Sequence, residues 1–190
     1  MKLLKRKLLL QLLDVQQVGK DYIAKRLSKI LYYPLVVSHT TRQKRKKETN
    51  GVEHWFNTKE EFQNVLDNQT VIAYTKIGEY EYCATLDDIQ DNCIYVIDPN
   101  GIKHLREHFG NEINLVVVYV YCDKEIRQAR ASERSDYMSA WHKRNKDEDR
   151  QFTEFEMNRD WDTIIDNSNV LDIEAIKNRV KEAIKIKIGE

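Results

Sequence analysis

Two arginines in the segment SHTTRQKRKKETNGVEHWF, which runs from Ser38 to Phe56, are well suited to chemistry on a phosphate. A planar guanidinium grips a phosphate through paired hydrogen bonds, so Arg42 and Arg45 predict a site for a phosphate-bearing ligand. The run RQKRKK is also typical of a solvated basic turn or a nucleic-acid patch. The chain has 31 basic and 31 acidic residues and a formal net charge of zero, so any anion site has to be local.

A second candidate anion site lies at Gly19 and Lys20, which follow the apolar run LLLQLLD. An apolar strand, a loop, Gly-Lys and a helix-like segment form the layout of the phosphate-binding motif G-x-x-x-x-G-K-[ST]. Asp14 stands at the first glycine position and Asp21 at the last. The intervening DVQQV lacks the small residues that let backbone N–H groups approach a phosphate, which predicts weak nucleotide binding. A local shift of the reading frame is another explanation of DVQQV, and resequencing would test it.

The pattern of apolar residues predicts the elements that position these side chains. Strand-like runs at Leu8–Leu13, Asn92–Asp98 and Asn114–Cys122 alternate with helix-like segments, as is typical of parallel strands in βαβ units. A shorter run ends at Asp166 before a last helix, whereas residues 35–85 form short strand-like pieces around one helix at Lys59–Leu66. The sequence therefore predicts one α/β domain, with a core over 1–34, 86–125 and 146–190 and an inserted, more antiparallel lobe over 35–85.

The Ser38–Phe56 segment resembles the acceptor-site signature of guanylate kinases, S-x-T-T-R-x-P-R-x-G-E-x-x-G-x-x-Y-x-F. Lys44, Lys47 and His54 replace the Pro, the second Gly and the Tyr. The resemblance implies a P-loop NTPase-like parallel sheet flanked by helices, an inserted lobe that binds the acceptor, and an arginine-bearing lid over 126–145. The positions that match in register without a gap are Ser38, Thr40, Thr41, Arg42, Arg45, Glu48, Gly51 and Phe56.

The same resemblance implies an acceptor site for GMP. The YCAT motif aligns with Y-G-[ST]-[SPT], which directs the Tyr82 hydroxyl to the phosphate, and VIDPNG aligns with D-[IV]-D-x-Q-G, which assigns Asp98 to the guanine edge. Asp98 before a proline is also typical of a helix cap. Ala73 and Ala84 stand where the family has a Glu and a Ser, which puts specificity for guanine in question. The implied GMP-binding residues are Ser38, Arg42, Arg45, Glu48, His54, Tyr82 and Asp98.

Further motifs imply a donor site. RQARASERSDYMSAWHKR resembles the lid, with Arg130 and Arg134 on R-x-x-x-R, and IIDNSN resembles V-x-N-[DS] near the donor's adenine. Lid arginines neutralise charge that develops on the transferring phosphoryl group. A carboxylate at Asp21 is a good Mg²⁺ ligand, so Mg²⁺ is expected there with ATP. The implied ATP-binding residues are Gly19, Lys20, Asp21, Arg130 and Asn167, and the implied catalytic residues are Lys20, Arg42, Arg134 and Arg144.

Three functions stay open at this point. The favoured one is transfer of the γ-phosphoryl group of ATP to GMP or a related nucleotide, weakened by the altered loop. The second is a binding module of the same fold that has lost catalysis and binds a nucleotide or a phosphopeptide. Nucleic-acid binding through RQKRKK is the least favoured. The expected partners are therefore ATP and GMP, in a monomer or homodimer.

The remaining features predict a cytoplasmic protein that does not enter a membrane. Cys83, Cys93 and Cys122 have no C-x-x-C spacing, which argues against a disulfide framework and a zinc site and fits a reducing compartment. The start MKLLKRKLLLQLLD has the basic flank and leucines of a secretion signal, but no small-residue cleavage site follows it. No run approaches the roughly 18–20 apolar residues that span a bilayer.

Overall fold

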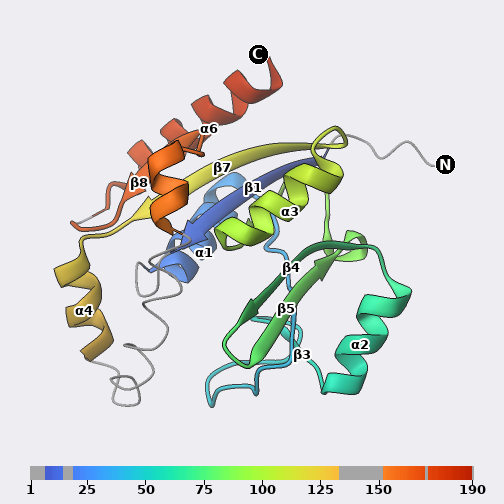
Figure 1. The fold of residues 1–190 in the computed structure, drawn as a ribbon. Coiled ribbons are helices and arrows are strands. Elements are labelled where there is room, and N and C mark those ends of the chain that lie inside the picture. The colour runs from blue at the N-terminus through green and yellow to red at the C-terminus, as the bar shows by residue number, and fades with distance from the viewer. Residues whose placement is uncertain (1–6, 15–18, 133–151, 170, 190) are drawn as a thin grey trace.

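The computed structural model describes residues 7–14, 19–132, 152–169 and 171–189. Within these residues the chain forms two sheets, one above the other in the view of Figure 1. The first has the strand order β6-β1-β7-β8 and the second the order β3-β2-β5-β4. We call the first sheet and its helices the core, and the second sheet and its helix the inserted lobe.

All strand pairs of the core sheet are parallel, as the sequence predicts. β1 lies in the middle and pairs with β6 on one side and with β7 on the other. The apolar run of β7 is deeply buried, with Val116, Val117 and Val118 fully enclosed. Parallel strands of this kind are covered on both faces, which explains why the sequence shows continuous apolar runs here. The strands are β1 (Lys7–Asp14), β6 (Cys93–Val96), β7 (Ile113–Tyr121) and β8 (Thr163–Asp166).

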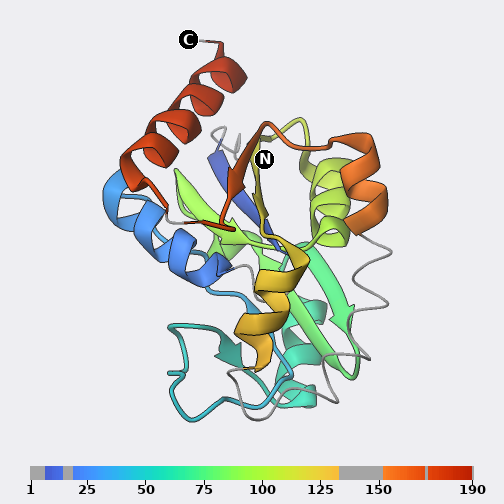
Figure 2. The ribbon, with the colours of Figure 1, turned by 90° about the vertical axis from the view of Figure 1, so that its left-hand side faces the viewer.

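Helices cover both faces of the core sheet. Figure 2 shows α1 (Lys20–Leu31) and α6 (Ile173–Ile188) on one face, and α3 (Pro99–Phe109) with a helix over residues 152–158 on the other. α4 (Lys124–Ser132) leaves the end of β7. Among the described residues, no helix combines the length and the apolar character that crossing a bilayer requires.

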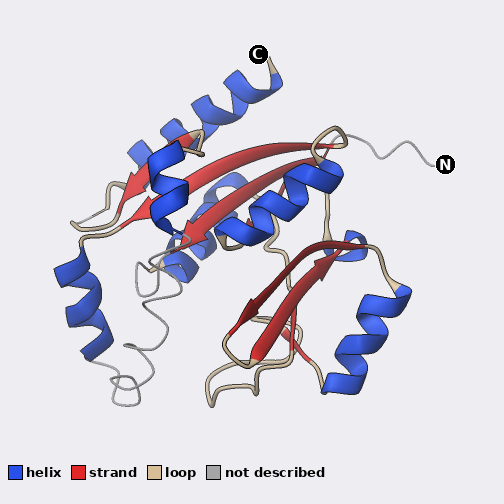
Figure 3. Ribbon diagram, in the orientation of Figure 1, coloured by secondary structure: helices blue, strands red, loops and turns tan. Residues whose placement is uncertain are grey.

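The inserted lobe is built on the hairpin of β4 (Val71–Ile77) and β5 (Tyr80–Thr85). β2 (His39–Thr40) joins β5, and β3 (Trp55–Phe56) joins β2 at the edge of the sheet. α2 (Lys59–Asn68) lies beside this sheet in Figure 3 and is stabilised at its start by a capping box. A short 3-10 helix, η1 (Leu86–Asp88), follows β5 and returns the chain to the core.

One of the short strand-like pieces of the lobe, the run LVVSHTT at residues 35–41, forms a strand only at His39–Thr40. Leu35 instead makes an isolated parallel bridge to Ile94 of β6, so the segment is shared between the two sheets. β2 and β3 pair in parallel, because the long connection between them is a loop that returns in the same direction and not a hairpin. The predicted division into core, lobe and lid remains a prediction, since residues 133–151 lie outside the described residues.

Candidate functional site

The guanidinium of Arg42 is held by the carboxylate of Glu48. Its Nη1 donates to Glu48 Oε2 and its Nη2 to Glu48 Oε1, both at 2.9 Å, and Nη1 also donates to the Gln43 carbonyl at 2.9 Å. The backbone N–H of Arg45 donates to Glu48 Oε2 at 2.8 Å. We call Arg42 and Glu48 the clasp. Because both oxygens of Glu48 accept hydrogen bonds from Arg42, the carboxylate fixes the plane of the guanidinium.

The two threonines before Arg42 fix the backbone that carries the clasp. The Thr40 hydroxyl donates to the Glu81 carbonyl at 3.0 Å and accepts from the Arg42 N–H at 3.1 Å. The Thr41 hydroxyl accepts from the Glu81 N–H at 2.9 Å, and its own N–H donates to the Glu81 carbonyl. These bonds tie the start of the loop to β5, which explains why hydroxyl residues precede the arginine.

Three more of the predicted acceptor residues surround the clasp. Ser38 Oγ and His54 Nδ1 are 3.0 Å apart, and the His54 ring makes an edge contact with the Tyr82 ring at 5.9 Å between centroids. Tyr82 in turn interacts electrostatically with Arg42. Gly51 allows the loop to turn back, because its φ of +77° favours glycine and a Cβ there would lie 2.8 Å from the Trp55 ring. The structure therefore brings Ser38, His54, Tyr82, Arg42 and Glu48 into one cluster.

Both members of the clasp are charged at neutral pH. Burial lowers the pKa of Arg42, but hydrogen bonds and charge from Glu48 and Tyr82 outweigh it and raise the pKa above the usual value. Burial likewise raises the pKa of Glu48, but hydrogen bonds from Arg42 and from the Arg45 N–H outweigh burial and hold that pKa below its usual value. A phosphate that reaches Arg42 therefore meets an oriented cation whose charge is partly balanced by Glu48.

Arg45 lies at the edge of this cluster. Its side chain is 56% exposed and its Nη1 is 3.8 Å from Glu48 Oε1. The next residues, Lys46 and Lys47, are also exposed. Arg45 therefore can swing toward a ligand at little cost, in contrast to the buried Arg42, which is 8% exposed.

Asp98, which the sequence assigns to the guanine base, is the N-cap of α3. Its Oδ1 accepts the Gly101 N–H at 2.8 Å, and the following proline occupies the first turn of the helix. The helix-cap alternative is thus confirmed, and the guanine-binding role of Asp98 stays a prediction. Ala73 and Ala84 are direct partners across β4 and β5 and are 1% and 0% exposed. This pair places two methyl groups, and no hydrogen-bonding side chain, at that row of the sheet.

Three predicted donor residues also lie together. Gly19 has a φ of +81°, and a Cβ there would lie 2.8 Å from Asn167 Nδ2. Arg130 Nη2 donates to the Asn167 carbonyl at 3.0 Å. Gly19 is the N-cap of α1 and supplies no side-chain cap to the first N–H groups of that helix. Gly19, Asn167 and Arg130 therefore form a second cluster at the carboxyl ends of β1, β7 and β8.

The other predicted donor residues lie at the start of α1 or outside the described residues. Lys20 is the first residue of α1, and Asp21 is an exposed residue in the first turn of that helix. An exposed carboxylate there fits Mg²⁺, which binds through one or two carboxylates together with the phosphates of a nucleotide. No group of three or more His, Cys, Asp or Glu side chains in the described part of the chain is arranged for a metal. Arg134, Arg144 and loop residues 15–18 lie outside the described residues.

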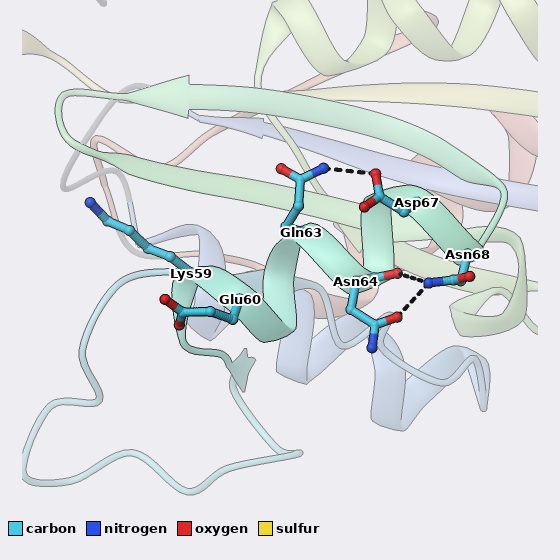
Figure 4. Close-up of a pocket in the computed structure, with 6 residues that line it drawn as sticks. All are labelled: Lys59, Glu60, Gln63, Asn64, Asp67 and Asn68. Atoms are coloured by element: carbon cyan, nitrogen blue, oxygen red, sulfur yellow. Dashed lines mark hydrogen bonds between the residues drawn. The ribbon is translucent and has the colours of Figure 1, made fainter.

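A hollow of about 590 Å³ on α2 contains none of these residues. Figure 4 shows its lining on the exposed face of the helix, where the Gln63 amide donates to Asp67 at 2.8 Å and the Asn68 amide donates to the Asn64 carbonyl at 3.0 Å. These polar groups satisfy one another and converge on no common point. We assign no function to this hollow.

The sequence reasoning missed one contributor to the acceptor cluster. Phe56, which matched the signature but had no assigned role, lies under the Arg42 guanidinium at 5.3 Å from the ring centroid and adds a cation–π contact.

Comparisons with known proteins identify the family of the chain. A family model described as guanylate kinase matches residues 6–187. The guanylate kinase of Onion yellows phytoplasma (strain OY-M) is 33% identical over 115 residues, which cover 56% of this chain and 54% of that enzyme. MAGUK p55 subfamily member 7 of Xenopus tropicalis is 35% identical over 81 residues, 40% of this chain and 14% of that protein. The chain thus spans about half or less of the length of these relatives.

A solved structure supports the fold. The crystal structure of guanylate kinase from Anaplasma phagocytophilum superposes with a TM-score of 0.68 at 21% identity and covers 95% of this chain and 87% of that chain. At this identity the likeness establishes the architecture, including the parallel core and the inserted lobe. The match of the family model to nearly all of the sequence, together with the Arg42 cluster in its predicted segment, shows that the chain belongs to the guanylate kinase family.

Proposed function

We propose that the chain transfers the γ-phosphoryl group of ATP to a nucleoside monophosphate, with GMP as the preferred acceptor. The observation that carries this proposal is the cluster around Arg42, where a buried guanidinium is oriented by Glu48 and ringed by Ser38, His54 and Tyr82. Such a site suits a phosphate on a small ligand, because a cation of fixed orientation and the hydroxyls of Ser38 and Tyr82 come together from different elements. Arg45 supplies a further cation from the exposed loop.

In this proposal the second cluster holds the donor. The N–H groups at the start of α1 and Lys20 would bind the donor phosphates, with Asn167 and Arg130 beside them. Mg²⁺ bound with ATP would neutralise charge on the phosphate chain, with Asp21 as its protein ligand. Arg42 and Arg45 would hold the acceptor phosphate in line for attack, and Arg134 and Arg144 would stabilise charge on the transferring group.

A binding module without catalysis is the second candidate function. The sequence around residues 14–18 favours it, because Asp14 brings a Cβ and a negative charge to a position where the motif has glycine. The acceptor cluster, in contrast, keeps its charged residues. We therefore expect acceptor binding to survive even where donor binding is weak.

The test separates acceptor binding from phosphoryl transfer. GMP is titrated by calorimetry into wild type, Arg42→Ala and the control Lys46→Ala, which removes an exposed cation from the same loop. Loss of the charged hydrogen bonds of Arg42 should weaken binding by roughly 1.5–3 kcal/mol, and the control should change it by less than about 0.5 kcal/mol. Equal affinities of all three proteins would contradict the acceptor site.

Phosphoryl transfer is measured as ADP formation with ATP·Mg²⁺ and GMP. Turnover should depend on Lys20, with Lys29→Ala on the same helix as the control, since Lys29 lies exposed in its last turn. Restoring glycine and small residues across 14–18 should raise turnover at least about tenfold, or about 1.4 kcal/mol in transition-state free energy. GMP binding that needs Arg42, without ADP formation in either background, would favour the binding module.

A further inference from the structure

Two arginines of α4, Arg127 and Arg130, follow the carboxyl end of β7 and lie one helical turn apart. Arg130 Nη1 donates to Cys122 Sγ at 3.4 Å and its Nη2 to the Asn167 carbonyl at 3.0 Å. Arg127 lies three residues earlier, on the same side of the helix. Burial raises the pKa of the Cys122 thiol, whereas the charges of Arg130 and Arg127 both act to lower it, which indicates that both cations are near this sulfur.

The Arg127 side chain has donors without acceptors. Its Nε and Nη1 are buried and have no hydrogen-bond partner within the described part of the chain. The hydroxyl of Tyr119, which lies near Arg127, donates to Glu156 and accepts a hydrogen bond from neither of these atoms. Buried donors without partners are rare in native proteins and destabilise the fold, and a second cation nearby adds repulsion. An anion that fits between the two arginines would relieve both penalties.

The location of Arg127 and Arg130 indicates which kind of anion would bind there. In parallel α/β sheets, ligands bind outside the carboxyl ends of the strands. β1, β7 and β8 end together at this edge in Figure 1, and α4 begins there. Gly19, the N-cap of α1, lies against Asn167, and Asn167 is bonded to Arg130. Arg127 therefore lies one helical turn along α4 from Arg130, a residue of the proposed donor site.

We propose that Arg127 is an additional binding residue for the phosphate chain of the donor nucleotide, acting beside Arg130. This role rests on the proposed function for the identity of the donor, but the anion site itself does not require catalysis. A planar guanidinium with two buried, unused donors binds a phosphate oxygen without first breaking a protein contact.

The test uses a probe that contains only phosphate. Inorganic tripolyphosphate is titrated by calorimetry into wild type, Arg127→Gln and Lys124→Gln, in which an exposed cation of the same helix is lost. Arg127→Gln should weaken binding about tenfold or more, and the control no more than about twofold. Arg127→Lys should recover part of the loss, because the charge returns without the guanidinium. Absence of tripolyphosphate binding to wild type, or equal binding by wild type and Arg127→Gln, would overturn the proposal.

Two further readouts distinguish ligand binding from a structural role. ATP should lose affinity in Arg127→Gln while adenosine, which has no phosphate, does not. The melting temperature of ligand-free Arg127→Gln should be unchanged or higher, since the removed donors were unpaired. A lower melting temperature together with equal losses for ATP and adenosine would assign Arg127 to packing. Arg127-dependent binding of tripolyphosphate without ADP formation would retain this anion site and reject the proposed kinase.

Discussion

Replacing Glu48 with Gln removes the charge of the clasp while keeping its shape. In the structure Glu48 accepts two hydrogen bonds from Arg42 at 2.9 Å and one from the Arg45 N–H at 2.8 Å, and the Arg42 and Glu48 side chains are 9% and 14% exposed. A charged hydrogen bond contributes about 1.5–3 kcal/mol, and breaking a buried pair costs about 3–5 kcal/mol. Since Gln retains one acceptor oxygen and the pair is not fully buried, we expect a loss of about 2–3 kcal/mol in the free energy of unfolding.

Urea denaturation followed by tryptophan fluorescence measures this loss at pH 7. Glu60→Gln, an exposed carboxylate on α2, is the control and should change stability by less than about 0.5 kcal/mol. A double-mutant cycle with Arg42→Met should give a coupling energy of about 1.5 kcal/mol or more. A loss below about 0.5 kcal/mol, or additive single variants, would refute the clasp as a stabilising pair.

The same pair makes a pH-dependent contribution. Burial raises the pKa of Glu48, but the bonds from Arg42 and the Arg45 N–H hold it below the usual value of 4.5. A carboxylate with a lowered folded pKa stabilises the fold fully above its unfolded pKa and loses that contribution as pH falls through the folded pKa. The stability difference between wild type and Glu48→Gln should therefore be constant above about pH 5 and shrink below pH 4.5.

Three further substitutions test other parts of the clusters. Gly19→Ala forces an alanine into a φ of +81° and places its Cβ 2.8 Å from Asn167 Nδ2. The variant should lose about 1–3 kcal/mol of folding free energy, measured by thermal unfolding, and should bind ATP more weakly in calorimetry. Ser38→Ala removes a hydroxyl 3.0 Å from the His54 imidazole of the acceptor cluster and should weaken GMP binding by about 0.5–1.5 kcal/mol. Unchanged GMP affinity would exclude the hydroxyl from the site. Burial lowers the pKa of His39, but bonds to Asp88 and a neighbouring amide raise it overall, so this pair stabilises the fold below pH 6.5 and loses that effect as pH rises through the folded pKa. Asp88→Asn should therefore destabilise more at pH 6 than at pH 9 in urea denaturation, and an equal loss at both values would contradict a charged His39.

The elements of the core could be predicted from the sequence because they depend on local patterns. The strand at Lys7–Asp14, the strand at Ile113–Tyr121 and the buried face of α6 follow from apolar runs and helical spacing, which any short window of sequence contains. The acceptor segment could also be predicted from the sequence, because Arg42 and Glu48 are six residues apart and one loop brings them together. The family model and the solved guanylate kinase structure confirm the predicted family and fold.

Tertiary structure alone decided which distant side chains meet. Asn167 reaches both Gly19 and Arg130 because β1, β7 and β8 end at the same edge, and no local pattern encodes that distance. The pairing of Ala73 with Ala84 depends on the register of a hairpin that contains an irregularity. The unpaired donors of Arg127 likewise become apparent only in the folded chain. Hydrophobic periodicity specifies faces of elements, whereas contacts between elements depend on register and packing, which are properties of the whole fold.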